Sequence, residues 1–195
     1  MSNHARIPVF ALAFAVAISG LSATAHAQHP ARATAAHAAM SGAWTGTLRY
    51  RDYQDSTRFV TLPTLLDGAL ATDSTSVTLA FTYDDGPGKT VRSTDRFALD
   101  ATMRRLAWGP SDGKRPATLF TVTSQTQADT IQLALESDGM DDNRPARIRE
   151  SIELRADGMR IRKEVRFTGA TVWLFRHEYT FARRNDPARA EAPGR

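Results

Sequence analysis

Residues 146–183 read ARIRESIELRADGMRIRKEVRFTGATVWLFRHEYTFAR, and this stretch decides the fold. In its first part Ile148, Glu150, Ile152 and Leu154 fall on one side of a two-residue alternation, with charged residues on the other. A period of two with one apolar face is typical of a β-strand that covers a core. The stretch therefore predicts three consecutive antiparallel strands, at Ala146–Arg155, Met159–Phe167 and Thr171–Arg183.

The two turns in this stretch differ in what they predict. Asp157-Gly158 favours a two-residue type I′ hairpin, which would place Leu154 opposite Ile161. The last strand would turn its aromatic face inward and set Lys163 opposite His177, because aromatic burial outweighs a turn preference. Gly169-Ala170 instead suits a type II′ turn, which would turn Leu174 and Arg176 inward. An inward aromatic face then requires a β-bulge or a three-residue loop.

The rest of the chain repeats short alternating segments between turn signals, and no segment has helical apolar spacing. The further strands are predicted at Trp44–Tyr50, Arg58–Leu66, Val77–Tyr83, Thr90–Leu99, Arg105–Trp108, Ala117–Ser124 and Thr130–Glu136. Residues 67–74 and the acidic segment 137–144 are expected to be loops. The fold class is therefore all-β: an up-and-down antiparallel meander of about ten strands that closes into a barrel and so leaves no exposed edge.

The N-terminus has the pattern of an export signal. Residues 7–21 are apolar, and Ala25-His26-Ala27 is an A-x-A cleavage site, so residues 1–27 are expected to be a signal peptide. Residues 28–40 are expected to form a flexible arm, residues 41–183 the barrel and residues 184–195 a disordered tail. The chain has no cysteine, which excludes disulfides and thiolate chemistry. The localisation predicted is periplasmic or extracellular.

Gly42-Ala43-Trp44 opens the first strand, and with the strand plan it resembles the lipocalins and the wider calycin group. In that family a Gly-x-Trp begins the barrel, and the tryptophan plugs its closed end. The resemblance implies structural roles for Gly42 and Trp44, with an arginine of the last strand, Arg176 or Arg183, packed over the indole. It also implies an interior that can hold one small ligand. The family's Thr-Asp-Tyr motif, disulfide and following helix are absent from this sequence.

Polar residues on faces expected to be inside mark the candidate site. With the aromatic wall, they form the predicted ligand-binding set: Tyr50, Asp95, Glu150, Lys163, Trp173, Phe175, His177 and Tyr179. Buried charges are costly unless paired or hydrated, so the acid, the lysine and the histidine form either a self-satisfied network or an anchor for a ligand's carboxylate or hydroxyl. Asp138, Asp141, Asp142 and Asn143 lack the spacing of an EF-hand, and a solvated acidic loop is favoured over a calcium site. No catalytic or metal-binding motif is present.

Three functions follow as hypotheses. The first is a carrier or sensor of a small amphipathic or anionic ligand, present as a monomer or small oligomer, which needs no cofactor. The second is a haem-binding or enzymatic barrel that uses His177. The third is an envelope protein whose arginine-rich outer face binds an anionic polymer. The net charge of +4 is too mild to indicate nucleic acid, and the apolar N-terminal run is too short to indicate membrane insertion.

Overall fold

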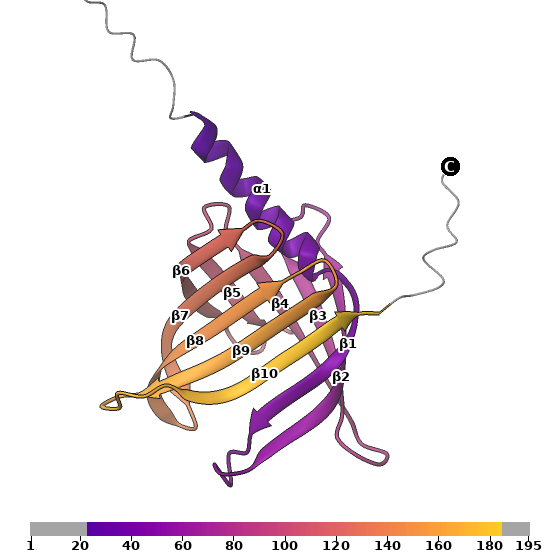
Figure 1. Cartoon of the computed structure of the whole chain (residues 1–195), viewed down its shortest axis with the longest axis vertical. Coiled ribbons are helices and arrows are strands. Elements are labelled where there is room, and N and C mark those ends of the chain that lie inside the picture. The colour runs from indigo at the N-terminus through magenta and orange to yellow at the C-terminus, as the bar shows by residue number, and fades with distance from the viewer. Residues whose placement is uncertain (1–22, 185–195) are drawn as a thin grey trace, which may run out of the picture.

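A computed structural model describes residues 23–184, and the side chains of residues 31–184. One antiparallel meander of ten strands closes into a barrel, because the last strand pairs with the first (Figure 1). The predicted fold class is confirmed. The strands are β1 (Gly42–Arg51), β2 (Phe59–Leu70), β3 (Val77–Asp84), β4 (Thr90–Leu99), β5 (Arg105–Pro110), β6 (Thr118–Gln127), β7 (Ile131–Asp141), β8 (Arg144–Leu154), β9 (Gly158–Phe167) and β10 (Leu174–Arg183).

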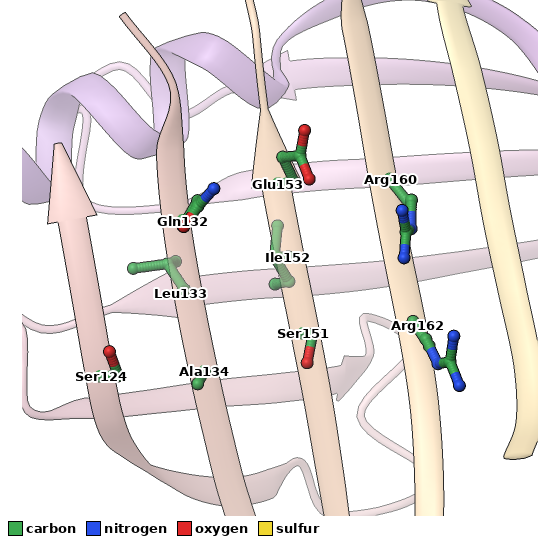
Figure 2. A pocket seen from close by; sticks show the side chains of 9 residues that line it. All are labelled: Ser124, Gln132, Leu133, Ala134, Ser151, Ile152, Glu153, Arg160 and Arg162. Atoms are coloured by element: carbon green, nitrogen blue, oxygen red, sulfur yellow. The ribbon is translucent and has the colours of Figure 1, made fainter. Parts of the chain in front are cut away.

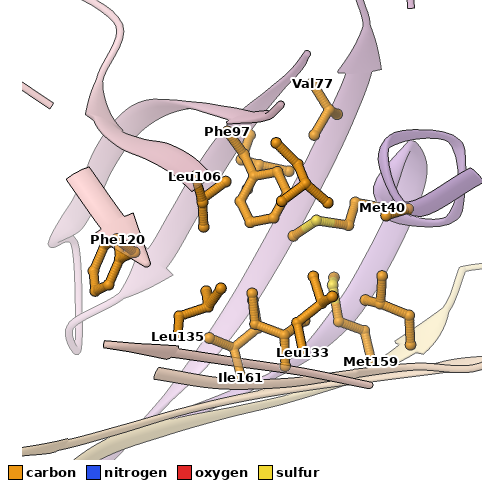
Figure 3. Packing of buried hydrophobic residues seen from close by; sticks show 14 of the residues in the cluster. Met40, Val77, Phe97, Leu106, Phe120, Leu133, Leu135, Met159 and Ile161 are labelled. Carbon is orange, nitrogen blue, oxygen red and sulfur yellow. The ribbon is translucent and has the colours of Figure 1, made fainter. Parts of the chain in front are cut away.

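The barrel interior is filled by the apolar face of each strand. In β8, for example, the buried residues alternate strictly with residues that face outward, as the sequence pattern predicts. Side chains such as Phe97, Leu106, Leu135 and Ile161 meet from opposite walls and are fully excluded from solvent (Figure 3). One end of the barrel is therefore a packed core.

The segment before the barrel differs from the expected arm. Residues 28–40 belong to a helix, α1 (Ala23–Met40), whose C-terminal part packs against the end of the barrel (Figure 1). Ala33, Ala36 and Met40 are buried, and Met40 points from the helix into the core (Figure 3). The prediction of a flexible arm was wrong. Only a few residues make the apolar contact with the barrel, so the sequence of the segment shows no clear helical period of apolar residues. Residues 1–22 and 185–195, which include most of the predicted signal peptide and tail, lie outside the described residues.

A histidine of α1 forms hydrogen bonds to the backbone of the barrel. The His37 ring lies within hydrogen-bonding distance of two backbone groups: Nδ1 is 2.9 Å from the Ser74 carbonyl oxygen, and the Leu99 amide donates to Nε2 at 3.0 Å. Only the neutral imidazole with its proton on Nδ1 satisfies both. Burial lowers the pKa of His37, which favours this neutral form.

The Gly-x-Trp motif closes the same end of the barrel. Trp44 is fully buried, and its Nε1 donates a hydrogen bond to the Met40 carbonyl at 3.1 Å. The guanidinium of Arg183 stacks 3.7 Å from the centre of the Trp44 ring. Gly42 has a φ of +96°, and a Cβ there would lie 2.7 Å from Arg183 Nη1. Of the two arginines predicted to cover Trp44, Arg183 is the one that does so.

Several predicted registers and loops are shifted. The β8–β9 turn is centred on residues 156–157, so Leu154 pairs with Met159 and Glu150 lies directly opposite Lys163. β7 and β8 extend through the expected acidic loop and meet at a tight turn in which Asp142 and Asn143 both have positive φ. This is the backbone that a two-residue hairpin requires, and asparagine and aspartate tolerate it.

Similar extensions and shifts occur elsewhere. β2 runs past its predicted end at Leu66 to Leu70. It tolerates Pro63, which pairs with Thr47 of β1 but lies just past the last residue that pairs with β3. In the β4–β5 hairpin, a turn centred on residues 101–102 is predicted from the sequence and would pair Asp95 with Trp108. The structure instead pairs Phe97 with Trp108.

β10 combines the two alternatives that the sequence left open. A bulge at Arg176 shifts the register, so that Leu174 lies opposite Val165 and His177 lies opposite Lys163. Before the bulge Leu174 faces inward and Phe175 outward; after it His177, Tyr179 and Phe181 face inward. Arg176 itself is buried. The predicted pairing of Lys163 with His177 is confirmed. Of the bulge and the three-residue loop that the sequence allowed, a bulge occurs, but it lies within β10, so the predicted inward position of Trp173 and Phe175 was wrong.

Candidate functional site

A cavity of about 200 Å³ lies inside the barrel, beyond the packed core. Five of the predicted ligand-binding residues line it, on four strands: Asp95, Glu150, Lys163, His177 and Tyr179. Phe81, Trp108, Phe120 and Ile148 complete an apolar wall. The strand register thus brings these residues together around one space, although they span about eighty positions in the sequence.

A second hollow, of about 280 Å³, adjoins the first at His177. It is lined by Leu48, Tyr50, Tyr53, Leu62, Tyr83, Asp85, Val91, Arg176 and His177. Tyr50 and Tyr53 come from the end of β1 and the loop that follows it, at the opposite end of the barrel from α1 (Figure 1). His177 is therefore shared between the interior cavity and the hollow at this end.

Glu150 is the least satisfied group in the cavity. It lies opposite Lys163 in the β8–β9 pair, and its Oε2 is buried with no hydrogen-bond partner among the described residues. Burial raises the pKa of Glu150 to about 8, against the opposing pull of the Lys163 ammonium. At neutral pH the carboxyl is therefore mostly protonated and carries an O–H donor.

His177 is uncharged for a related reason. Burial, reinforced by the nearby positive charge of Lys163, lowers the pKa of His177 to about 3. Its ring makes no hydrogen bond to another described residue, and it packs edge-on against Tyr179 with the ring centres 5.4 Å apart. A neutral imidazole can donate one hydrogen bond and accept another.

A buried ion pair next to the cavity was missed by the sequence reasoning. Arg176 contacts Asp141 Oδ2 through Nε and Nη2, each at 2.6 Å, and Lys163 Nζ contacts Asp141 Oδ1 at 3.2 Å. The Tyr53 hydroxyl also donates to Asp141 Oδ1 at 3.3 Å. The Asp141 carboxylate thus contacts two cations. It fixes Lys163 at the cavity wall, where the ammonium group has further N–H donors for another acceptor.

Two further polar pairs lie in the wall. The hydroxyls of Tyr83 and Tyr179 are 2.9 Å apart, and the Trp108 Nε1 donates to Asp95 Oδ2 at 3.3 Å. Burial raises the pKa of Tyr179 well above its ordinary value and also raises that of Asp95. These pairs leave Glu150 and His177 as the groups without internal partners.

The two aromatic residues assigned wrongly to the interior contact arginines on the outer surface. The Trp173 ring lies 4.2 Å from the Arg149 guanidinium and 5.0 Å from that of Arg166. Phe175 lies 5.1 Å from the Arg162 guanidinium. Contacts with guanidinium groups stabilise these aromatic rings at the surface. The alternation of residues in the sequence does not show where a bulge reverses the face of the strand.

The acidic segment held a signal that the sequence reasoning did not use. Asp142-Asn143 is itself a two-residue turn sequence, and a hairpin there places Asp138 and Asp141 on opposite faces of β7. Asp138 is exposed and pairs with Arg147, whereas Asp141 is buried. No group of three or more potential metal-ligating side chains occurs within the described part of the chain.

A third hollow, of about 270 Å³, lies on the outer surface of β6–β9. Its polar lining includes Ser124, Gln132, Ser151, Glu153, Arg160 and Arg162 (Figure 2). It is separated from the interior cavity by the sheet itself. The two are therefore independent candidate sites.

Comparison with known proteins supports the fold alone. The crystal structure of Rv2717c from M. tuberculosis superposes with a TM-score of 0.54 at 15% sequence identity, covering 78% of this chain and 97% of that one. No family model matches the sequence, and no curated protein matches it. None of the described helices is long and apolar enough to cross a membrane. The chain is a closed ten-stranded antiparallel β-barrel, the general architecture of calycin-like barrels.

Proposed function

We propose that this protein is an exported, lipocalin-like barrel that binds one small amphipathic molecule in its interior. The observation that carries the proposal is the buried Glu150 Oε2, which lines a cavity and has no hydrogen-bond partner in the part of the chain that the structure describes. Buried polar groups are nearly always paired, so an orphaned one at a cavity wall indicates a missing partner. Its place beside Lys163 and His177 gives the cavity one polar side, while Phe81 and Trp108 form the apolar side.

The polar side favours a ligand group that accepts hydrogen bonds. Protonated Glu150 and the Lys163 ammonium are both hydrogen-bond donors. Because Glu150 is mostly neutral at neutral pH, it does not neutralise the positive charge of Lys163. A carboxylate or hydroxyl on the ligand would accept from both. The aromatic walls favour a flat apolar body of limited size, since the cavity volume is only about 200 Å³.

Three small aromatic probes test this proposal: benzoate, benzyl alcohol and toluene. Each is titrated into the protein while tryptophan fluorescence is followed, because Trp108 lines the cavity. Benzoate is expected to bind most tightly and toluene most weakly, and Trp108→Phe should remove most of the signal change. If toluene binds as well as benzoate, the polar anchor is wrong.

A matched pair of lysine variants identifies the anchor. Lys163→Met should weaken benzoate binding about tenfold or more, the loss expected for a charge-assisted hydrogen bond, while toluene binding persists. Lys114→Met makes the same change of charge in an exposed loop and should alter neither. Equal effects of the two variants would show that only net charge matters.

A haem group liganded by His177 is the second candidate function. The neutral imidazole is the form that ligates iron, and His177 is neutral, lacks hydrogen bonds to described residues and adjoins two hollows. The group would supply iron chemistry, and His177 would hold it from β10. Addition of haemin should then give a Soret band that His177→Ala abolishes. A band that survives His177→Ala would remove this candidate.

A further inference from the structure

The outer hollow of β6–β9 is built from two neighbouring rows of outward-facing residues. Strand pairing sets Ser124, Ala134, Ser151 and Arg162 in one row across four strands. Gln132, Glu153 and Arg160 form the adjacent row (Figure 2). With neighbouring strands about 4.8 Å apart, the first row crosses about 14 Å of surface and the second about 10 Å.

Small side chains make the floor of this hollow and long ones make its rim. Ala134 and Ser151 lie opposite each other at the centre, so the surface is lowest there. The volume of about 270 Å³ equals that of roughly nine waters, at ~30 Å³ each. The result is a shallow groove that runs across the strands.

Two arginines at the rim keep part of their guanidinium groups at the surface. Arg162 Nη2 contacts Glu164 at 2.9 Å and its Nη1 lies 4.0 Å from Glu178, while its buried Nε makes no hydrogen bond within residues 31–184. Arg160 contacts Glu178 through its Nε at 3.0 Å. The side chains of Arg160 and Arg162 are 51% and 36% exposed, so their remaining N–H groups can donate to an acceptor that comes from outside the chain.

Arginines continue beyond the groove along the same face. Arg49, from β1, stacks 4.2 Å from the Phe59 ring and forms no ion pair with a described carboxylate. Arg166, from β9, stacks on Trp173 in the same unpaired state. Each guanidinium carbon thus lies over an aromatic ring, and its N–H groups are not used in an ion pair with a described carboxylate. The face thus presents further cationic donors beyond the β9 edge of the groove.

We propose that this face binds an acidic polysaccharide. A sugar ring would lie in the groove, with its hydroxyls on Ser124, Gln132, Ser151 and Glu153 and its carboxylate or sulfate on Arg160 and Arg162. The arginines beyond the groove bind the acidic groups of neighbouring sugars. This site is independent of the interior cavity.

Other polyanions fit this face less well. Single-stranded nucleic acid needs aromatic faces for base stacking, and the faces of Phe59 and Trp173 are covered by guanidinium groups. Glu153 can accept hydrogen bonds from sugar hydroxyls. The groove also has no exposed apolar side chain that would enter a lipid surface.

The test is a calorimetric titration of the chain from Gln28 to Arg195, the predicted mature protein, with an oligogalacturonate at about 50 mM salt. Binding is expected to weaken as salt rises, because the contacts are between exposed charges. Arg160→Gln with Arg162→Gln should reduce affinity about tenfold or more, for loss of two charge-assisted contacts. Arg92→Gln with Arg104→Gln, which makes the same change of charge on exposed positions of β4 and the β4–β5 turn, should change it less than about twofold.

A second variant separates the groove from the charges. Ser151→Gln keeps every charge but fills the floor, and it should also reduce affinity; thermal unfolding confirms that each variant is folded. Heparin in place of oligogalacturonate distinguishes sulfate from carboxylate recognition. The proposal is overturned if no acidic saccharide binds, if the two arginine pairs have equal effects, if Ser151→Gln leaves affinity unchanged, or if only anionic phospholipid vesicles bind.

Discussion

Replacing Asp141 by Asn tests whether the buried ion pair is a structural support of the cavity. The side chain of Asp141 is 2% exposed and that of Arg176 is 4% exposed. The substitution keeps the shape but removes the charge that two cations share. Breaking a buried pair costs about 3–5 kcal/mol, because the remaining charge is left uncompensated. With an m value of about 2 kcal/mol/M, the urea midpoint should fall by roughly 1.5–2.5 M.

Asp138→Asn is the matched control on the same strand. Asp138 pairs with Arg147 at 3.0 Å, but its side chain is 82% exposed. Such a surface pair contributes about 0–1 kcal/mol, so the midpoint should fall by less than about 0.5 M. Both transitions are followed by tryptophan fluorescence in urea. Equal midpoints for the two variants would refute the reasoning.

A second substitution checks the cause of the loss. If the cost of Asp141→Asn comes from an unpaired guanidinium, adding Arg176→Met should restore part of the stability, because no buried charge then lacks a partner on that side. Lys163 keeps one uncompensated charge, so recovery should be partial. A double variant less stable than the sum of the single losses would contradict this explanation.

Three further predictions concern Glu150, helix α1 and export. The pKa of Glu150 in the folded protein, about 8, lies above its ordinary value of 4.5. The stabilisation from protonated Glu150 is therefore complete below pH 4.5 and is lost as the pH rises towards 8. Glu150→Gln should reduce this pH dependence of the free energy of unfolding, measured by urea titration. His37→Ala should cost about 1–3 kcal/mol of unfolding free energy, since the Leu99 amide loses its acceptor. Export should remove residues 1–27 and leave Gln28 as the first residue, visible by intact mass; retention of Met1 would contradict cleavage.

The sequence predicted the barrel because the period-two pattern is repeated in each long strand. The inward placement of Glu150, Lys163, His177 and Tyr179 followed from the same alternation. The pairing of Lys163 with His177 was also predictable, because the aromatic face after the bulge is the one that the interior buries.

The errors within the barrel have one physical cause. A bulge or a tight turn changes which face of a strand a residue lies on, and the hydrophobic pattern of the sequence does not reveal it. A one-residue bulge at Arg176 sent Trp173 and Phe175 outward and brought a guanidinium inside. The partner of that guanidinium, Asp141, was hidden in a segment that looked like a solvated loop. The bulge in β10 buries Arg176, and the turn at Asp142-Asn143 buries Asp141, which pairs with it. Either feature without the other would bury an unpaired charge, so the two depend on each other. No alternation pattern contains that information.

The position of α1 was missed for a different reason. Its buried contacts come from small residues and from a histidine that bonds backbone atoms, so the helix carries no apolar stripe. Ala33, Ala36, His37 and Met40 all follow the predicted cleavage site. The mature chain would therefore keep the part of the helix that packs against the barrel.

We propose that the interior cavity holds a small molecule anchored at Glu150 and Lys163. Native mass spectrometry of the protein, purified without denaturation from the cells that make it, tests this proposal. We predict one bound small molecule per chain, which is retained by Lys114→Met and lost or strongly depleted in Lys163→Met. A wild-type spectrum that shows only the mass of the bare chain would contradict the claim.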